Sequence, residues 1–140
     1  MGFAARTAFG SVLVSVILLA SAAFSSDEPR SCESGPYVVQ IHAEWCGTCK
    51  SIALTWEQLR VDVGDQATLV TLDVTDRAAT EASRATAEEL GITDFFNEYR
   101  RQTGTVGVID CKTLEPVSIL RAERDLSKYR EAIAKATPAS

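Results

Sequence analysis

The sequence predicts an α/β fold in which a four-stranded mixed sheet is flanked by helices on both faces. Short runs rich in Val and Ile alternate with longer stretches in which apolar residues recur at helical spacing. The elements follow the order β-α-β-α-α-β-β-α, and a helix joins the first two strands, so these should be parallel. A short connection joins the last two strands, which should therefore form an antiparallel hairpin.

The first strand and the first helix follow one another directly. Residues 37–42, YVVQIH, are apolar and β-branched, which predicts a buried strand. From Gly47 onward the apolar residues follow helical spacing, so a helix is expected to begin within the pair Cys46–Cys49 and to run to about Arg60. The Gly-Asp dipeptide that follows Val63 should end it.

The middle of the chain supplies a second strand and two helices. Residues 67–74, ATLVTLDV, predict the strand, and Asp76 is expected to cap a helix over 77–90. Residues 92–101 predict a further short helix capped by Asp94. Its aromatic residues have helical spacing and are expected in the core, with a partner-binding surface as the alternative: Phe95, Phe96 and Tyr99.

The carboxy-terminal part predicts the hairpin and a last helix. Residues 105–110 and 117–122 read as strands that a tight connection joins, and 126–136 read as the final helix. The site-bearing stretch lies where the first strand gives way to a helix, which is the usual place for a site in open α/β sheets.

Composition and charge exclude several classes of function. The chain has 140 residues, of which 46% are hydrophobic and 24% charged, as expected for one globular domain. Its net charge is −5 and it contains no basic run, which argues against binding to nucleic acid or anionic lipid. We expect no nucleic-acid partner and a monomeric protein.

The amino terminus has the layout of an export signal. A single Arg precedes the apolar run 8–24, and Ala20-Ser21-Ala22 fits the small-x-small pattern of a cleavage site. We expect residues 1–22 to be a signal peptide, with a retained N-terminal membrane anchor as the alternative. Residues 23–36 then form a polar linker and 37–137 the folded domain, which would lie outside the cytoplasm, in the periplasm if the source is bacterial.

Two of the four cysteines, Cys46 and Cys49, stand three residues apart in the stretch HAEWCGTCK. A helix start concentrates partial positive charge and free N–H groups, which stabilise a thiolate. Cys46 should therefore be the more acidic thiol and the nucleophile, and Cys49, one turn later, can resolve a mixed disulfide. A zinc site usually takes four Cys or His ligands, whereas His42, the one His of the chain, would bring this pair only to three. No metal and no other cofactor is expected.

The motif AEWCGTCK at a strand-to-helix turn, together with this element order, resembles the thioredoxin superfamily. The resemblance covers about residues 37–136 and implies a thioredoxin-like fold with a redox-active Cys46–Cys49 pair. Four neighbours are candidates for supporting roles. Trp45 shields the edge of the site and faces partners, or it packs in the core. Lys50 favours the thiolate form of Cys46 by its positive charge, or it is a solvated surface residue. Gly47 and Thr48 let the chain turn between the two cysteines.

The first departure from the thioredoxin pattern lies on the strand before the motif. Many thioredoxins carry a buried acid beneath the second Cys, where this chain has Gln40, an amide that cannot take up a proton. Gln40 and His42 alternate onto the same face of the strand. His42 falls where thioredoxins commonly have an aromatic residue. We expect it to be a packed, half-buried histidine, with a role as the base for Cys49 as the alternative.

The second departure lies in the loop that thioredoxins place opposite the Cys pair. The family usually has a cis-proline there, and this chain has Gly104 between Thr103 and Thr105. A cis bond without proline costs about 2.5 to 4 kcal/mol, so a trans bond or a rearranged loop is expected. The resemblance implies that Thr103, Gly104 and Thr105 present their backbone to a substrate.

Cys32 and Cys111 lie at the other end of the predicted sheet. The third strand starts near the site and should run antiparallel to the first, so its end reaches the start of the first strand. Cys32 is five residues upstream of Tyr37 and Cys111 directly follows Asp110. We expect a structural Cys32–Cys111 disulfide. Two unpaired thiols, or Cys32 bonded to another molecule, are the alternatives.

These residues and the resemblance predict an exported thioredoxin-like thiol–disulfide oxidoreductase. Its expected partners are exported proteins with a disulfide or dithiol, whose disulfides it would reduce, and a membrane-borne electron donor that recycles it. Net oxidation of substrate dithiols remains an alternative, because the two residues between Cys46 and Cys49 do not determine the reduction potential of the pair. A copper or zinc chaperone that uses the CxxC pair and a redox-inert partner-binding adaptor are the other candidate functions.

Overall fold

The computed structural model describes residues 32 and 34–137, so the predicted signal peptide or anchor over 1–22 lies outside the described residues. The elements are, in order, β1 (Tyr37–His42), α1 (Gly47–Val63), the 3-10 turn η1 (Gly64–Gln66), β2 (Thr68–Asp73), α2 (Arg77–Leu90), α3 (Thr93–Tyr99), β3 (Thr105–Ile109), β4 (Pro116–Arg121) and α4 (Leu126–Ala136). The predicted fold class and order are confirmed, with strand ends that differ by at most one residue.

The four strands form one mixed sheet in the order β2-β1-β3-β4. β1 pairs in parallel with β2 and antiparallel with β3, and β3 and β4 form the predicted antiparallel hairpin. The register sets Tyr37 opposite Ile109 and Gln40 opposite Val106. β1 therefore lies in the interior of the sheet, and its carboxyl end, where the Cys pair follows, lies beside the start of β3.

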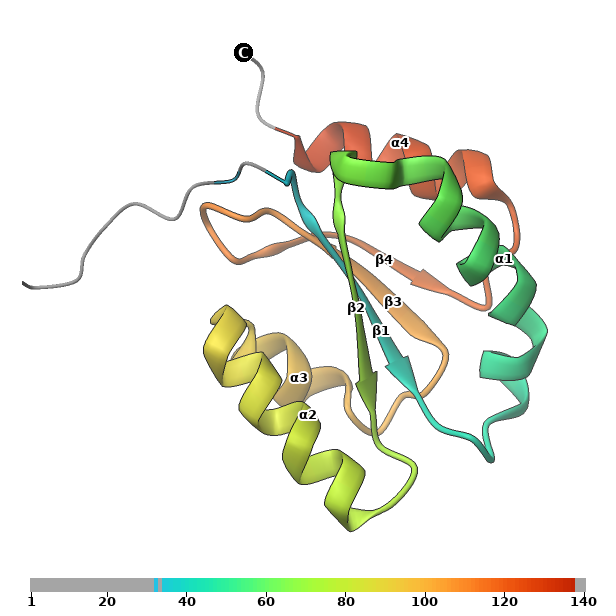
Figure 1. The fold of residues 1–140 in the computed structure, drawn as a ribbon, viewed down its shortest axis with the longest axis vertical. Coiled ribbons are helices and arrows are strands. Elements are labelled where there is room, and N and C mark those ends of the chain that lie inside the picture. Colours follow the sequence, from blue (N-terminus) through green and yellow to red (C-terminus); the bar gives the residue numbers. More distant parts are fainter. Residues whose placement is uncertain (1–31, 33, 138–140) are drawn as a thin grey trace, which may run out of the picture.

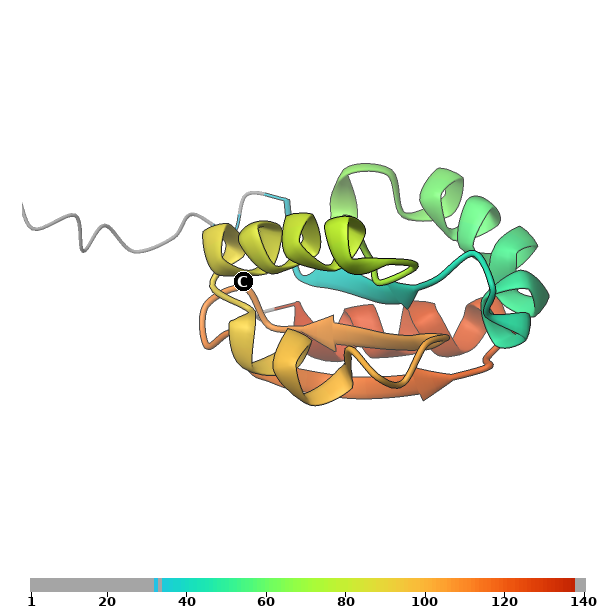
Figure 2. The ribbon, with the colours of Figure 1, turned by 90° about the horizontal axis from the view of Figure 1, so that it is seen from below.

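Helices cover both faces of the sheet, as Figures 1 and 2 show: α1 and α4 lie on one face and α2 and α3 on the other. Because side chains alternate along a strand, β1 contributes to two cores. Val38 belongs to the core beneath α1 and α4, and Val39 and Ile41 belong to the core beneath α2 and α3. Gln40 and His42 follow Val38 on the α1 side.

Helix α1 is longer than the sequence predicts. The apolar residues that define its buried face are Ile52, Trp56, Leu59 and Val63. Val63 is 4% exposed and extends that face by a turn, so the helix ends at Val63 rather than at about Arg60. Gly64, with φ +48°, ends it.

The caps of α2 and α3 differ from one another. Asp76 caps α2 as predicted, because its side chain accepts a hydrogen bond from Ala79 N at 2.8 Å. The predicted cap of α3 is wrong: Asp94 lies inside the first turn, and Ile92 is the N-cap, with no side-chain hydrogen bond. Ile92 is 1% exposed, so burial of its side chain, not a polar cap, sets the start of α3.

The aromatic residues of α3 belong to the core, as expected, and this excludes Phe95 and Phe96 as a partner surface. Phe95 is 4% exposed, Phe96 is fully buried, and the Phe95 and Tyr99 rings are in contact, tilted by 35° with their centroids 4.9 Å apart. A Cβ at Gly107 on β3 would lie 2.6 Å from Phe95 Cζ, so glycine is needed there for the close approach of this ring.

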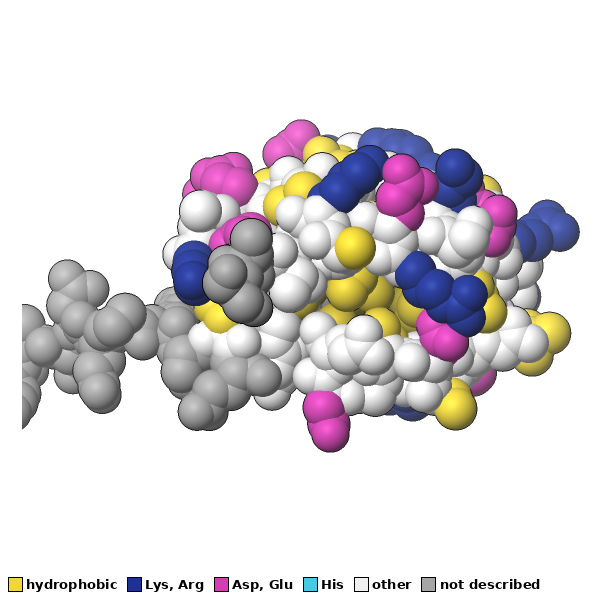
Figure 3. Space-filling model, turned by 90° about the horizontal axis from the view of Figure 1, so that it is seen from above, with side chains coloured by type: hydrophobic (Ala, Val, Ile, Leu, Met, Phe, Trp, Pro, Cys, Tyr) yellow, Lys and Arg dark blue, Asp and Glu magenta, His cyan; other side chains and the backbone are white. Residues whose placement is uncertain are grey.

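The outer surface of α1 and α4 carries mixed charges. Figure 3 shows basic and acidic side chains interspersed with apolar ones on this side of the molecule, without an extended basic patch. In the part of the chain that the structure describes, no helix has the length and apolar character needed to cross a membrane.

Candidate active site

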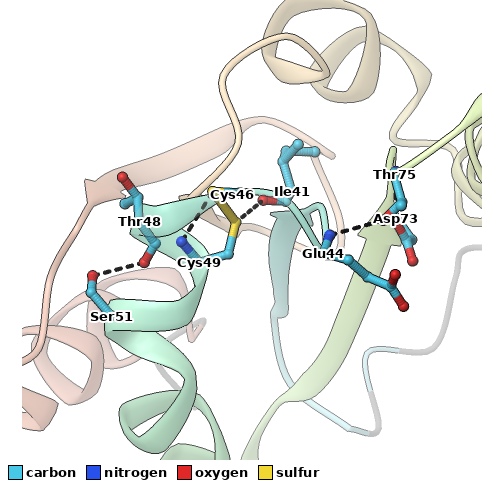
Figure 4. The surroundings of a disulfide bond; sticks show 8 residues. All are labelled: Ile41, Glu44, Cys46, Thr48, Cys49, Ser51, Asp73 and Thr75. Atoms are coloured by element: carbon cyan, nitrogen blue, oxygen red, sulfur yellow. Dashed lines mark hydrogen bonds between the residues drawn. A yellow bond between two sulfur atoms is a disulfide. The ribbon is translucent and has the colours of Figure 1, made fainter.

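Cys46 and Cys49 lie at the turn that joins β1 to α1. Cys46 is the N-cap of α1, and its Sγ accepts a hydrogen bond from Cys49 N at 3.0 Å (Figure 4). The two cysteines are joined by a disulfide, with their Cα atoms 5.2 Å apart. The first turn of α1 contains no acidic residue. The helix start therefore offers the Cys46 sulfur an N–H donor and positive partial charge, which together stabilise a thiolate.

The two cysteines differ in burial. Cys46 is 5% exposed and Cys49 only 1%. The Cys49 sulfur lies 3.8 Å from Ile41 O, to which a reduced Cys49 thiol would donate (Figure 4). Both sulfurs are thus buried in this oxidised form, and Cys46 is slightly the less buried of the two.

The residues between and after the cysteines form the first turn of the helix. Gly47 is exposed, has no positive φ and would have no heavy atom within 4 Å of an added Cβ, so the turn does not require glycine. Thr48 is half-buried, and Thr48 O accepts a hydrogen bond from Ser51 Oγ at 2.8 Å. Lys50 is exposed.

A loop that follows β2 holds the chain just before Cys46. Glu44 N donates to Thr75 Oγ1 at 2.9 Å, and Trp45 Nε1 donates to Thr75 O at 2.9 Å. Thr75 is held in turn by Asp73, whose Oδ1 accepts a hydrogen bond from Thr75 N at 2.7 Å. Trp45 is 64% exposed, so the alternative that it packs in the core is wrong.

The loop with Gly104 lies directly against the Cys pair. Gly104 has φ +84°, and its N–H donates to Ile41 O at 2.8 Å. A Cβ at this position would lie 2.8 Å from Thr48 Cβ and 3.7 Å from Cys49 N. Thr103 is half-buried and Thr105 is 1% exposed. All peptide bonds in the described residues are trans, and the positive φ of Gly104 brings the loop close to the disulfide.

A cavity of about 230 Å³ lies on the other side of Cys49, between β1, β2 and α1. Gln40 and His42 both line it, as their common strand face predicts, together with Cys49. Gln40 is 3% exposed and His42 half-buried. The other lining residues come from α1 and β2: Ala53, Trp56, Glu57, Arg60 and Thr71.

Sequence reasoning did not identify two parts of this site. The Asp73–Thr75 turn has a recognisable signal, an Asp whose side chain bonds the backbone two residues later. The side of the cavity that α1 forms also has a recognisable sequence signal, because Ala53, Trp56 and Arg60 follow Cys49 at helical spacing.

The described residues offer no metal centre at this position. Among residues 32 and 34–137 no group of three or more His, Cys, Asp or Glu side chains is arranged to hold a metal ion. His42, the third ligand that a metal site would need, lines the cavity beside Cys49 without completing such a group.

The remaining two cysteines lie at the opposite end of β1. Cys32 and Cys111 form a disulfide, with their Cα atoms 5.8 Å apart. Cys111 follows Ile109 by two residues, and Ile109 pairs with Tyr37 at the start of β1. The five steps from the first to the last residue of β1 span about 17 Å at roughly 3.3 Å each, so this bond is well separated from the Cys46–Cys49 pair.

Comparison with known proteins identifies related sequences. The thioredoxin family model matches residues 15–117. A thioredoxin of Staphylococcus aureus is 39% identical over 57 residues, which are 41% of this chain and 55% of that protein. The 16 kDa light chain of the flagellar outer-arm dynein of Chlamydomonas reinhardtii is 43% identical over 47 residues, 34% of this chain and 30% of that protein. The matches thus span only about a third to a half of these curated relatives.

A solved structure with a similar fold is that of Fasciola hepatica thioredoxin. It superposes with a TM-score of 0.50 and 23% sequence identity, over 75% of this chain and 84% of that one. At this identity the likeness concerns the fold alone, and it agrees with the sheet order and the flanking helices described above.

Proposed function

The chain belongs to the thioredoxin family, and on that basis we propose that it is an extracytoplasmic thiol–disulfide oxidoreductase that reduces disulfides in exported proteins. The observation that supports this most directly is the geometry of the Cys pair. Cys46 caps α1, Cys49 N donates to its sulfur at 3.0 Å, and the two sulfurs are close enough to bond. A thiolate at Cys46 is stabilised there, and its resolving partner is one helical turn away.

The reaction follows from these positions. The Cys46 thiolate attacks one sulfur of a partner disulfide, a Cys46–partner bond forms, and the other partner sulfur leaves as a thiolate. Cys49, as a thiolate, then attacks Cys46 Sγ. The Cys46–Cys49 bond forms, the second partner sulfur leaves with the electron pair, and the partner thiolates take protons from water. Two electrons pass to the partner, and a membrane-borne dithiol donor of the same compartment returns them.

Two surfaces beside the pair are suited to a protein substrate. Trp45 is 64% exposed and is held in place by its bond to Thr75 O, so it offers a rigid aromatic contact. The second is the loop at Thr103, which is half-buried and precedes the Gly104 that lies directly against Thr48. We propose that a substrate segment around its disulfide lies between these two surfaces, above Cys46.

The test is the reduction of insulin disulfides by the purified protein, with dithiothreitol as the electron donor. Cys46→Ser should abolish catalysis. Cys49→Ser should stop the reaction at the mixed disulfide, which can be isolated from the exporting cell with its partner attached. The matched control is Cys32→Ala/Cys111→Ala, which should retain catalysis at a temperature where its circular dichroism spectrum shows it to be folded. A wild-type protein that does not accelerate insulin reduction would refute the proposed activity. A mature protein that is found in the cytoplasm with residues 1–22 intact would refute its export.

A further inference from the structure

The resolving step poses a problem of proton transfer, because Cys49 must lose its thiol proton before it can attack. Cys49 is 1% exposed, so bulk water does not reach its sulfur directly. The nearest polar atom recorded at that sulfur is Ile41 O at 3.8 Å. A peptide carbonyl accepts a hydrogen bond but does not take up a proton near neutral pH. The proton must therefore leave by another route.

The cavity beside Cys49 provides that route. It has a volume of about 230 Å³, enough for several water molecules, and Cys49 lines it. Most of its other polar lining cannot accept the proton. Gln40 has an amide and Thr71 a hydroxyl, Trp56 has only an N–H donor, and the Arg60 guanidinium is always protonated.

Two lining side chains remain that could take up a proton, Glu57 and His42. Glu57 lies on α1, its side chain is 67% exposed, and it is paired with Arg60 at 3.7 Å. His42 is half-buried at the end of β1, two residues after Gln40 on the same strand face. On β2 its register partner is Asp73, whose Oδ1 accepts from both Thr75 N and Thr75 Oγ1. Histidine is the side-chain type whose unperturbed titration lies closest to neutral pH.

We propose that His42 takes up the proton of the Cys49 thiol through water in this cavity, and so drives the resolution of the mixed disulfide. This inference rests on the proposed function, since it concerns the second step of the same reaction. The Cys49 S–H proton passes to a neutral imidazole nitrogen, and the Cys49 thiolate attacks Cys46 Sγ. The Cys46–partner bond breaks, the partner sulfur leaves as a thiolate, and the imidazolium later returns its proton to water. No oxidant or reductant is needed beyond the partner disulfide.

The two steps can be observed separately with an aromatic disulfide that releases two coloured thiolates in succession. Reduced protein is mixed with this reagent in a stopped-flow instrument. The first phase reports attack by Cys46, and the second reports resolution by Cys49. His42→Phe, which keeps an aromatic ring, and His42→Gln, which keeps hydrogen bonding, should both leave the first phase unchanged. At pH 7 both should slow the second phase at least about tenfold, within the usual reach of acid–base catalysis.

The pH profile provides a second readout that a merely structural role would not change. In both variants the second phase should become faster as pH rises through about 8.5, the usual range of a cysteine thiol, because hydroxide can then remove the proton. The wild type should be much less dependent on pH in that range. Glu57→Gln, which removes the other candidate acceptor in the cavity, should behave as the wild type. Circular dichroism spectra and urea midpoints establish that each variant is folded.

Each outcome has a distinct meaning. A second phase of normal rate in either His42 variant would overturn the inference. A second phase that is slowed by Glu57→Gln and not by the His42 variants would overturn it as well. The absence of the first phase in the wild type would instead refute the proposed function itself.

Discussion

Replacing Gly104 with Ala should destabilise the protein substantially, because two independent costs coincide at this residue. Its φ of +84° costs an L-residue about 1 to 2 kcal/mol. The added Cβ would lie 2.8 Å from Thr48 Cβ, and relieving such overpacking typically costs about 1 to 3 kcal/mol. A stiffer unfolded chain offsets about 0.4 to 1 kcal/mol. We expect a net loss of about 2 to 4 kcal/mol, a large part of the roughly 5 to 15 kcal/mol of a typical domain.

A double-mutant cycle separates the two costs. Thr48→Gly removes the side chain that the new Cβ would meet, so in that background Gly104→Ala should cost only the part that comes from φ, about 1 kcal/mol. The free energy of unfolding is measured by urea titration followed by circular dichroism, with all four proteins in the oxidised state. A loss below about 1 kcal/mol for Gly104→Ala, or the same loss in both backgrounds, would show that the loop does not press on the Cys pair as described.

Three further predictions concern the remainder of the domain. Cys32→Ala/Cys111→Ala opens a loop whose ends are 79 residues apart in the sequence. The chain-entropy model predicts that the free energy of unfolding, measured by urea titration, falls by up to about 4 to 5 kcal/mol. A decrease below about 1 kcal/mol would contradict this prediction. Burial, with a smaller contribution from Glu123, raises the pKa of Tyr129 to about 12. Its contribution to stability should be complete below about pH 10 and lost by about pH 12, and Tyr129→Phe should remove that part of the alkaline slope. The N–H groups of Thr113 and Lys112 hold the pKa of Asp110 below its usual value. The contribution of Asp110 to the free energy of unfolding should be complete above its pKa in the unfolded chain and lost as pH falls through its pKa in the folded protein. Asp110→Asn should therefore make the free energy of unfolding less dependent on pH in acid. An unchanged midpoint of acid unfolding would argue against these hydrogen bonds.

Several features of the fold could be read from the sequence because short-range interactions determine them. β1, α2 and α4 begin and end at the predicted residues, since β-branched runs, the Asp76 cap and the glycine after α2 act on their own neighbours. The predictions that failed depended on burial. Val63 extends α1 because the core accepts another apolar residue, and Ile92 displaces Asp94 as the cap of α3 because its side chain is buried. The burial of Ile92 is not visible in a local pattern, whereas Val63 lies four residues after Leu59 and directly before the Gly-Asp dipeptide that is expected to end the helix.

The sequence by itself determined the order of the elements and the position of Cys46 and Cys49 at the start of a helix, because a cap and its helix lie within a few residues of one another. The tertiary structure alone decided what surrounds the pair. The hydrogen bond from Glu44 N to Thr75 Oγ1 joins residues that are 31 positions apart in the sequence. The contact of Gly104 with Thr48 joins the loop before β3 to helix α1. The cavity that His42 shares with Cys49 exists only when β1, β2 and α1 pack together. Such distances depend on strand register and on helix packing across the sheet, which are properties of the whole folded chain.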